Sequence, residues 1–458
     1  MVHFLRACAA ALAASLFAVT FLAASALAQA PEDLGWPKSE QLIGKYKAGK
    51  YAEVVAEAPA AIRAEPWNNE LRLAYAQSLL WSGHEWESVE QFRALLDTEY
   101  AIDARLGLAN GYAWSARPAQ AVPHYRALVG GPRSDEAKLG LANALLWIGR
   151  ADEALPLFQE LRAKHPDTDV GAEGLIYANR AVRAHSTFGL NYAHDNTPTT
   201  RVEPYVSHTW RDASNTWIFG LDASGGHDWG STLNLDRREY GFHVEKVDVP
   251  FAPRVTVSQQ TEPDKRTFGE LRLQLIDWPL YVNVGRVNWG KLAFTVPALD
   301  AGLTAKRFGV EGAYATPLGE LRGFANDWDI SDGNRVENAQ IRLTSNWRPL
   351  GREIKPYIGA EWRGADHTDP RYWSPRNYGL GFLGVEAAWV KLNWTISGLV
   401  QGGFKISGEA ATAWAANLGA KRWLTPDWAV GATIYALGGT RQAGYRARGA
   451  NLILEKLW

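Results

Sequence analysis

The chain has 458 residues, a formal net charge of −1 and 47% hydrophobic residues. This length is enough for two or three domains, and the balanced charge argues against a nucleic-acid partner. The single cysteine, Cys8, lies in the N-terminal segment. Once that segment is removed, a disulfide, a thiolate nucleophile and a cysteine metal site are all excluded. A cysteine-free chain suits export through an oxidising compartment.

Residues 1–28 have the layout of a secretory signal peptide. Arg6 supplies the positive charge, an apolar run follows, and Ala26-Leu27-Ala28 fits a small-x-small cleavage site. The alternative is a retained membrane anchor, because the apolar run is just long enough to cross a bilayer. We expect cleavage and export. No later stretch of the sequence is apolar for the length that a spanning helix needs.

A 33-residue repeat occupies the next part of the chain. Segments of similar sequence start at Leu71, Ala104 and Ala137, and each is followed by a second amphipathic segment, such as 151–164. Two helices per unit at this period resemble the tetratricopeptide repeat family. The fourth unit carries the resemblance most clearly, with small residues at the helix crossing, a glycine at the turn, an aromatic in the core and a closing proline: Ala142, Ala154, Gly149, Phe158 and Pro166.

The resemblance predicts an α-helical tetratricopeptide solenoid over residues 36–182. A degenerate first unit surrounds Gly49, and residues 169–183 are expected to form a closing helix. Pro123 and Pro156 fall inside second helices. We expect them to shorten or kink those helices, because proline removes a backbone hydrogen bond.

In such repeats the first helix of each pair lines a concave groove. By the geometry of the family, six side chains should face it: Gln77, Trp81, Asn110, Trp114, Asn143 and Trp147. A Trp repeated once per unit could stack on sugar rings or hold a peptide. The alternative is that these Trp residues fill the space between adjacent repeats, since a large aromatic stabilises by burial whether or not it binds anything. The repeats are expected to be a scaffold for protein contacts. Contact with sugar is a more specific alternative.

The region 185–458 changes from a helical to a two-residue hydrophobic period. Leu271 and Leu273, for example, alternate with Arg272 and Gln274. Alternating runs broken by Gly, Asn, Asp and Pro predict an antiparallel structure of about 16 strands. Longer connections are predicted at 225–238, 290–305, 364–377 and 438–446.

A soluble sandwich also alternates, but three features favour a transmembrane β-barrel. They are the leader together with a last strand that ends in the aromatic Trp458, strands of about ten residues, and Trp and Tyr at strand ends, as in an aromatic girdle. The last strand should close on the first, and Lys456 on its outer face must reach the membrane interface. An even strand number puts both barrel ends in the periplasm.

Residues 364–380 include Tyr372-Trp373-Ser374-Pro375, with Tyr378 three residues on. This motif resembles the Tyr-aromatic-Ser-Pro element in the C-terminal barrels of bacterial exopolysaccharide exporters, namely the outer-membrane cellulose-synthesis subunit and the poly-N-acetylglucosamine export porin. The resemblance implies periplasmic tetratricopeptide repeats joined to an outer-membrane barrel, and a role in polysaccharide export. The chain departs from these exporters in having only about four repeats where they have many. Direct docking to an inner-membrane synthase therefore stays open.

The leading hypothesis is a conduit for an exopolysaccharide. Its lumen needs adaptable hydrogen bonds and flat aromatic faces. Candidate lumen residues lie on polar strand faces: Arg272, Arg307, Glu311, Arg342, Glu361 and Arg363. The alternative for these charges is structural pairing between strands. A second hypothesis is a receptor, phage-adsorption or assembly protein with a plugged barrel and functional loops.

A lipid hydrolase is a third hypothesis. His367 and Ser374 share a loop, and His208 follows Ser207, but the spacing does not establish a nucleophile with its base. We expect no enzyme activity, no cofactor and no metal site. Three aspartates, Asp327, Asp329 and Asp332, lack the remaining ligands of a calcium loop.

The expected location is the outer membrane of a Gram-negative bacterium, with the repeats in the periplasm. The expected partners are outer-membrane lipid, the β-barrel assembly machinery, a polysaccharide chain, and periplasmic or inner-membrane polysaccharide-synthesis proteins that contact the repeats.

Overall fold

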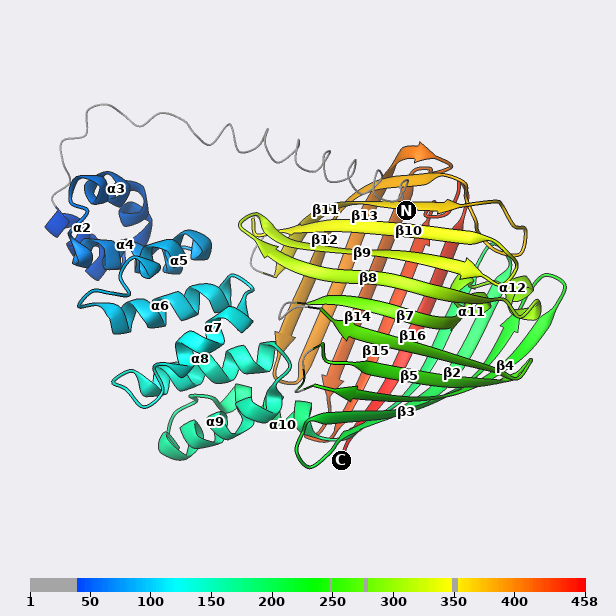
Figure 1. Cartoon of the computed structure of the whole chain (residues 1–458), viewed down its shortest axis with the longest axis horizontal. Coiled ribbons are helices and arrows are strands. Elements are labelled where there is room, and N and C mark those ends of the chain that lie inside the picture. The colour runs from blue at the N-terminus through cyan, green and yellow to red at the C-terminus, as the bar shows by residue number, and fades with distance from the viewer. Residues whose placement is uncertain (1–38, 248, 250, 276–278, 348–352) are drawn as a thin grey trace. The chain divides into compact units, whose positions relative to one another are not determined.

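The computed structural model describes residues 39–458 apart from 248, 250, 276–278 and 348–352. The expected leader, residues 1–28, lies outside the described residues. The chain divides into two compact units, one ending at Ala181 and one beginning at Val182 (Figure 1). Within the described ranges, no helix has both the length and the apolar character needed to cross a membrane.

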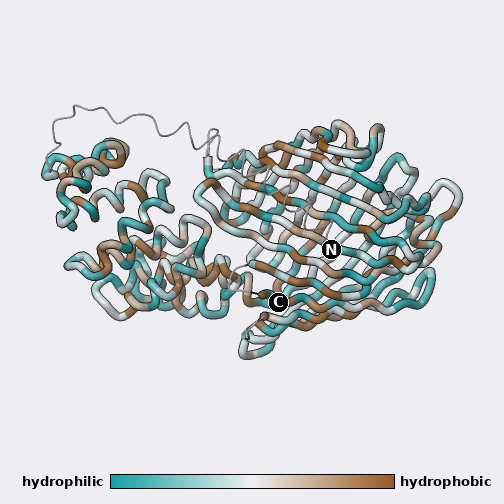
Figure 2. The backbone as a smooth tube through the Cα atoms, turned by 45° about the horizontal axis from the view of Figure 1, so that its top comes forward, coloured by the Kyte–Doolittle hydropathy of each residue, from teal (hydrophilic) through white to brown (hydrophobic). Residues whose placement is uncertain are grey.

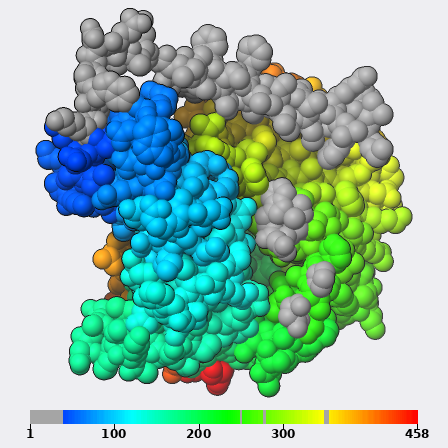
Figure 3. All heavy atoms as spheres, turned by 60° about the vertical axis from the view of Figure 1, so that its left-hand side comes forward, coloured from blue at the N-terminus to red at the C-terminus, as the bar shows by residue number. Residues whose placement is uncertain are grey.

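The first unit is a stack of helical pairs that follow one another in chain order, and the colours of its surface run in the same order from blue to green in Figure 3. Its pairs are closed by a final helix, as the repeat pattern predicts. The helices are α2 (Ser39–Lys47), α3 (Tyr51–Ala64), α4 (Asn69–Trp81), α5 (Glu85–Arg93), α6 (Ala101–Trp114), α7 (Pro118–Arg126), α8 (Ser134–Trp147), α9 (Ala151–Lys164) and α10 (Ala172–Val182).

Turns between paired helices share a left-handed residue. Gly49, Gly83 and Gly149 have φ of 75°, 82° and 83°, and Ala116 takes the same place in its unit with φ of 61°. The repeat geometry therefore holds at Ala116 even though an alanine there costs about 1–2 kcal/mol in this conformation.

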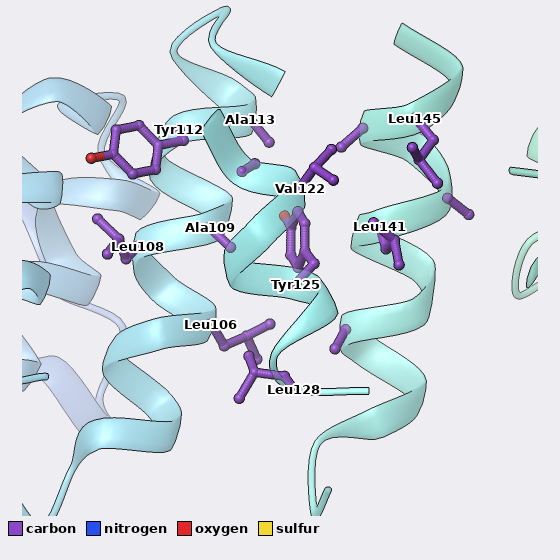
Figure 4. Packing of buried hydrophobic residues seen from close by; sticks show 14 of the residues in the cluster. Leu106, Leu108, Ala109, Tyr112, Ala113, Val122, Tyr125, Leu128, Leu141 and Leu145 are labelled. Atoms are coloured by element: carbon purple, nitrogen blue, oxygen red, sulfur yellow. The ribbon is translucent and has the colours of Figure 1, made fainter. Parts of the chain in front are cut away.

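The core of the first unit repeats one contact, in which an aromatic ring of a second helix packs on a glycine of the next helix. Tyr125 is buried against Gly140, and Phe158 lies in the same way against Gly174. Figure 4 shows Tyr125 between the helices that carry Ala109 and Leu141. A Cβ at Gly140 would lie 2.3 Å from the Tyr125 ring, so this close approach requires glycine.

The expected shortening by proline is wrong for α9. That helix continues through Pro156 to Lys164, because Phe158 and Leu161 beyond the proline are buried in the core and hold the last turns in place. The short helix α7 contains Pro123, but α5 has the same length without a proline. The short length of α7 is therefore a feature of the repeat and not an effect of Pro123.

The second unit is a closed barrel of sixteen antiparallel strands, which confirms the predicted strand number and closure. The strands are β1 (His185–Asp195), β2 (Thr199–Arg211), β3 (Trp217–Trp229), β4 (Asn234–Lys246), β5 (Arg254–Glu262), β6 (Arg266–Gln274), β7 (Leu280–Asn288), β8 (Thr304–Thr316), β9 (Gly319–Ile330), β10 (Arg335–Ser345), β11 (Ile354–Ala365), β12 (Tyr378–Lys391), β13 (Trp394–Gly408), β14 (Ala413–Trp423), β15 (Trp428–Gly438) and β16 (Arg446–Leu457).

Strand faces alternate between an apolar exterior and a polar interior, and Figure 2 shows the alternation along the strands. Large apolar side chains such as Val284, Phe308 and Ile358 are exposed on the outside, although a soluble protein rarely exposes a continuous apolar belt. A closed antiparallel barrel with such a belt is the architecture that crosses an outer membrane, because all its backbone groups are paired.

One expected connection is wrong. The predicted connection 225–238 is largely strand, because β3 and β4 continue pairing from Gly225↔Arg238 up to Trp229↔Asn234. Polar and glycine residues continue the ladder there beyond the apolar belt, where a hydrophobic pattern no longer marks it.

The first and last strands meet in register from His185↔Leu457 to Asp195↔Ala447. Both therefore have an end at the same rim, which we call the terminal rim; the opposite rim is the loop rim. At the terminal rim the Trp458 indole N–H donates to the Ser186 hydroxyl at 3.0 Å. Lys456 reaches Asp427 at 3.5 Å and lies over the Trp458 ring, as its expected position at the interface requires.

Replacing Gly140 with Ala should lower the free energy of unfolding of the helical unit by about 1–3 kcal/mol, because the added methyl overpacks the Tyr125 ring. Denaturant unfolding of the full chain in detergent, followed by circular dichroism of the helices, measures this. Gly44→Ala is the matched control: it meets nothing within 4 Å and should stabilise by about 1 kcal/mol. Equal effects of the two changes would contradict the packing argument.

Replacing Trp458 with Gly should reduce the fraction of assembled barrel, because it removes the indole that joins β16 to Ser186 across the seam. Heat-modifiable migration of the membrane fraction on gels measures assembly. Trp347, 70% exposed at the same rim but away from the seam, provides the control Trp347→Gly. Normal assembly of the Trp458 variant, or an equal defect in both, would count against the role of the seam.

Candidate functional site

The barrel interior is lined by ion pairs that reach over an intervening strand. Arg272 on β6 pairs with Glu311 on β8 at 3.1 Å, and Arg342 on β10 pairs with Glu386 on β12 at 2.9 Å. All six predicted lumen residues lie on inward strand faces. For these arginines, and for Arg307 with its partner Glu270 at 2.6 Å, the structural-pairing alternative describes the contacts that the structure contains.

Three connections at the loop rim fold together, and we call them the cap: residues 289–303, 366–377 and 439–445. The first contains α11 (Trp289–Ala293) and α12 (Val296–Asp300). The Thr295 hydroxyl donates to the Arg371 carbonyl at 2.6 Å, and Arg441 donates to the Ala293 carbonyl at 3.5 Å. The cap is therefore one connected structure, with its first segment at the centre.

The first segment of the cap crosses the lumen. On one side Trp289, only 2% exposed, packs in a cluster with Trp328 of β9. On the other side the backbone carbonyl of Lys291 accepts from Arg201 of β2 at 3.3 Å. Because β2 and β9 lie on opposite sides of the sixteen-stranded ring, a segment that contacts both must lie across it.

A buried charge network, which we call the latch, fixes the cap to the wall: Arg201, Glu203, Asp228, Arg237 and Lys291. Asp228 is fully buried and accepts from Arg201 at 2.5 Å and also from Arg237. Glu203 pairs with Arg237 at 3.1 Å and with Lys291 at 3.5 Å. Sequence reasoning missed these residues, because their pairing joins three strands and a distant loop.

The predicted loop motif lies in the cap and is tied to the β9–β10 turn. The Tyr372 hydroxyl donates to Asp332 at 3.0 Å and accepts from the Asn334 amide at 2.9 Å. Burial raises the pKa of Tyr372, and the Arg371 guanidinium holds the pKa of Asp369 below its usual value. The Ser374 hydroxyl accepts from the Asp369 amide at 2.7 Å. These bonds hold the motif in a fixed conformation and attach this part of the cap to the β9–β10 turn.

The residues of the hydrolase hypothesis are held apart or otherwise engaged. Ser207 and His208 are consecutive in β2 and point to opposite faces, and His208 contacts Ser186 at 2.8 Å instead. Ser374 is buried in the loop corner.

The three aspartates considered for calcium do not come together as ligands. Asp327 pairs with Arg335 at 2.5 Å, and Asp332 pairs with Arg371 at 2.8 Å. Over the described ranges of the chain, no group of three or more metal-ligating side chains is arranged around a common point.

The predicted groove residues of the helical unit divide into two kinds. Trp81, Trp114 and Trp147 are 57%, 42% and 56% exposed, so each ring keeps an open face, while Trp81 and Trp114 also contact each other between adjacent repeats. The polar members include two that are engaged in packing: Gln77 accepts from the Tyr46 hydroxyl, and Asn110 accepts from the Tyr125 hydroxyl at 2.6 Å. Asn143 is partly buried.

Comparison with known proteins identifies residues 114–172 as a match to the tetratricopeptide repeat family. No curated protein matches the sequence. A solved "bacterial polysaccharide outer membrane secretin" aligns over 60% of this chain and 99% of its own, with 11% identity and a TM-score of 0.48. OccK11 (OpdR) of Pseudomonas aeruginosa aligns over 60% of this chain and 96% of its own, with 8% identity and a TM-score of 0.34. A MamA structure covers 30% of this chain and 81% of its own, with 23% identity and a TM-score of 0.28. At these values the structural likenesses assign no function.

Replacing Asp228 with Asn should loosen the cap, because two buried arginines lose their shared carboxylate, a change that costs about 3–5 kcal/mol for a buried pair. Single-channel recordings of the full chain in planar bilayers should show larger or more frequent openings. Asp327→Asn is the control, since its pair with Arg335 lies on the outer face. Identical recordings from both variants and the unchanged chain would refute the latch.

Proposed function

We propose that the protein is an outer-membrane conduit for an exopolysaccharide, with its repeats as a periplasmic scaffold. The observation that carries the proposal is the combination of a charged, hydrogen-bonding lumen with a cap held to the wall by side-chain ion pairs. Such contacts can break and re-form without disturbing the backbone ladder of the barrel. A movable cap over a polar passage suits a chain-like polar cargo.

The first strand begins and the last strand ends at the terminal rim, which supports an orientation with this rim facing the periplasm. Both ends of an even-stranded barrel lie on the periplasmic side, and the longer connections lie outside. The cap, which contains the long connection 289–303, would then lie at the extracellular mouth. A polymer entering from the periplasm would cross the paired charges of the lumen before it meets the cap.

The exposed Trp81, Trp114 and Trp147 support a binding role for the repeats. Aromatic faces that remain in solvent can stack on sugar rings or receive side chains of a partner protein. The rings of Trp81 and Trp114 lie 5.4 Å apart, which joins two units into one surface. We propose that this surface receives the polymer or a polysaccharide-synthesis protein.

The second candidate is a receptor or assembly protein with a closed barrel. The tight packing of Trp289 against Trp328 of β9, with ring centroids 5.5 Å apart, favours it, because a permanently closed cap would leave only the outer loops available. The two candidates differ in whether the cap opens.

Replacing residues 290–302 with a short Gly-Ser linker should open the lumen, because this removes the segment that lies across it. Liposome flux assays with neutral and charged oligosaccharides measure passage, and gel migration verifies that the barrel is folded. The control replaces the Gly230–Leu233 turn with a linker of equal length. A folded barrel without residues 290–302 that passes neither ions nor oligosaccharides would refute the conduit.

Loss of secreted polymer on deletion of the gene, with rescue by the unchanged chain, is the expected cellular result. Intact polymer secretion together with altered phage or partner binding would favour the receptor.

A further inference from the structure

Two cavities lie on either side of a partition made by Trp373 and Arg441. The inner cavity has a volume of about 290 Å³ and is bounded by strand residues such as Asn338 and Glu361. The outer cavity, of about 330 Å³, is bounded mainly by loop residues. Trp373 and Arg441 line both. A polymer that moves from the inner cavity to the outer cavity must therefore pass these two side chains.

Arg363 in the inner cavity differs from the other predicted lumen arginines. Arg272, Arg307 and Arg342 each pair with a carboxylate. Arg363 instead donates to the Trp373 carbonyl at 3.3 Å and lies 4.8 Å from the Trp373 ring. Its buried Nε–H has no acceptor among the described residues. An unsatisfied buried donor on a cation is costly, and an anion bound in the cavity would supply the acceptor that this N–H lacks.

Arg441 adds a second guanidinium to the same cavity. Its carboxylate contact within the described residues, with Asp195, is long at 3.8 Å. Against these two cations stands Glu361, whose Oε1 is already engaged by the Tyr378 hydroxyl at 3.0 Å. The ionised side chains that line the cavity therefore carry one excess positive charge.

The remaining lining fits a sugar ring. Trp373 and Tyr378 meet edge to face with centroids 5.0 Å apart, and Phe324 lies on the same lining. Aromatic faces contact the C–H faces of sugars, while Asn338 offers an amide donor and acceptor for hydroxyls. The volume is near the lower end of small-molecule sites, about 300–1,000 Å³, which suits one sugar unit at a time.

We propose that the inner cavity is a subsite for a carboxylate-bearing sugar, with the carboxylate held by Arg363 and Arg441 and the ring beside Trp373. This inference rests on the conduit function and specifies its cargo as an acidic polysaccharide. Trp373 and Arg441, shared by both cavities, then form the gate through which successive sugar units leave the lumen.

Binding of defined oligosaccharides to the full chain in detergent tests the subsite. The probes are a tetramer of galacturonate and, as the neutral counterpart, maltotetraose, measured by calorimetry at low salt. The tetragalacturonate should bind more tightly, and Arg363→Gln should weaken it by at least about tenfold, because a hydrogen bond to a charged group is lost. Arg335→Gln, at an arginine that pairs with Asp327 on the outer face, should leave the affinity unchanged.

Arg441→Gln serves as the second variant, since this residue lies in a connection outside the strands and its loss spares the barrel wall if Arg363→Gln fails to assemble. It should also weaken the acidic tetramer and not the neutral one. Equal binding of the two tetramers, or unchanged acidic binding in both variants, would overturn the subsite and leave the cavity with water or a small inorganic anion.

Flux through liposomes separates this inference from the conduit itself. Suppose that oligosaccharides pass the barrel lacking residues 290–302, but Arg363→Gln does not weaken binding of the acidic tetramer to the full chain. The conduit then stands and the subsite is wrong. If the folded barrel passes no oligosaccharide, the conduit is wrong even where the acidic tetramer binds.

Discussion

A strand edge in a bilayer leaves its backbone N–H and C=O groups without partners, and each unpaired group costs several kcal/mol. The second unit satisfies this constraint by pairing β1 with β16, so that no strand in the described sheet has a free edge. Closure of the sheet determines the arrangement of the barrel interior. It sets which strands lie opposite each other, and it creates a lumen into which every second side chain must point.

That enclosed lumen explains why charges are tolerated there. A barrel of this size leaves room for water and for long side chains, and the inward arginines reach over a neighbouring strand to find carboxylates, as Arg272 does with Glu311. Such pairs stiffen the wall and keep the lumen polar. Arg363 is the informative exception, because a wall that pairs its other predicted lumen arginines leaves this one beside a cavity and two aromatic rings.

The cap shows how one closed sheet can carry a second, separable structure. Its apolar side, with Trp289 at the centre, packs on Trp328 of β9, while Lys291 on its polar side pairs with Glu203 of the latch at 3.5 Å. The apolar contact gives a default closed arrangement. The ion pairs give a contact that a charged cargo could compete for. The helical unit also combines a buried core with aromatic side chains that are partly exposed, namely Trp81, Trp114 and Trp147.

The sequence by itself determined the two architectures, because periodicity is a local property: a repeat of 33 residues predicts paired helices and a repeat of two predicts strands, down to which faces are polar. It also placed Lys456 and Trp458 at an interface. Only the tertiary structure decided which charge meets which, since Glu203 and Lys291 are distant in the chain and meet only when the ring closes. It also decided that Pro156 leaves α9 intact and that the repeated Trp residues are exposed, because both depend on packing between elements that no local pattern contains.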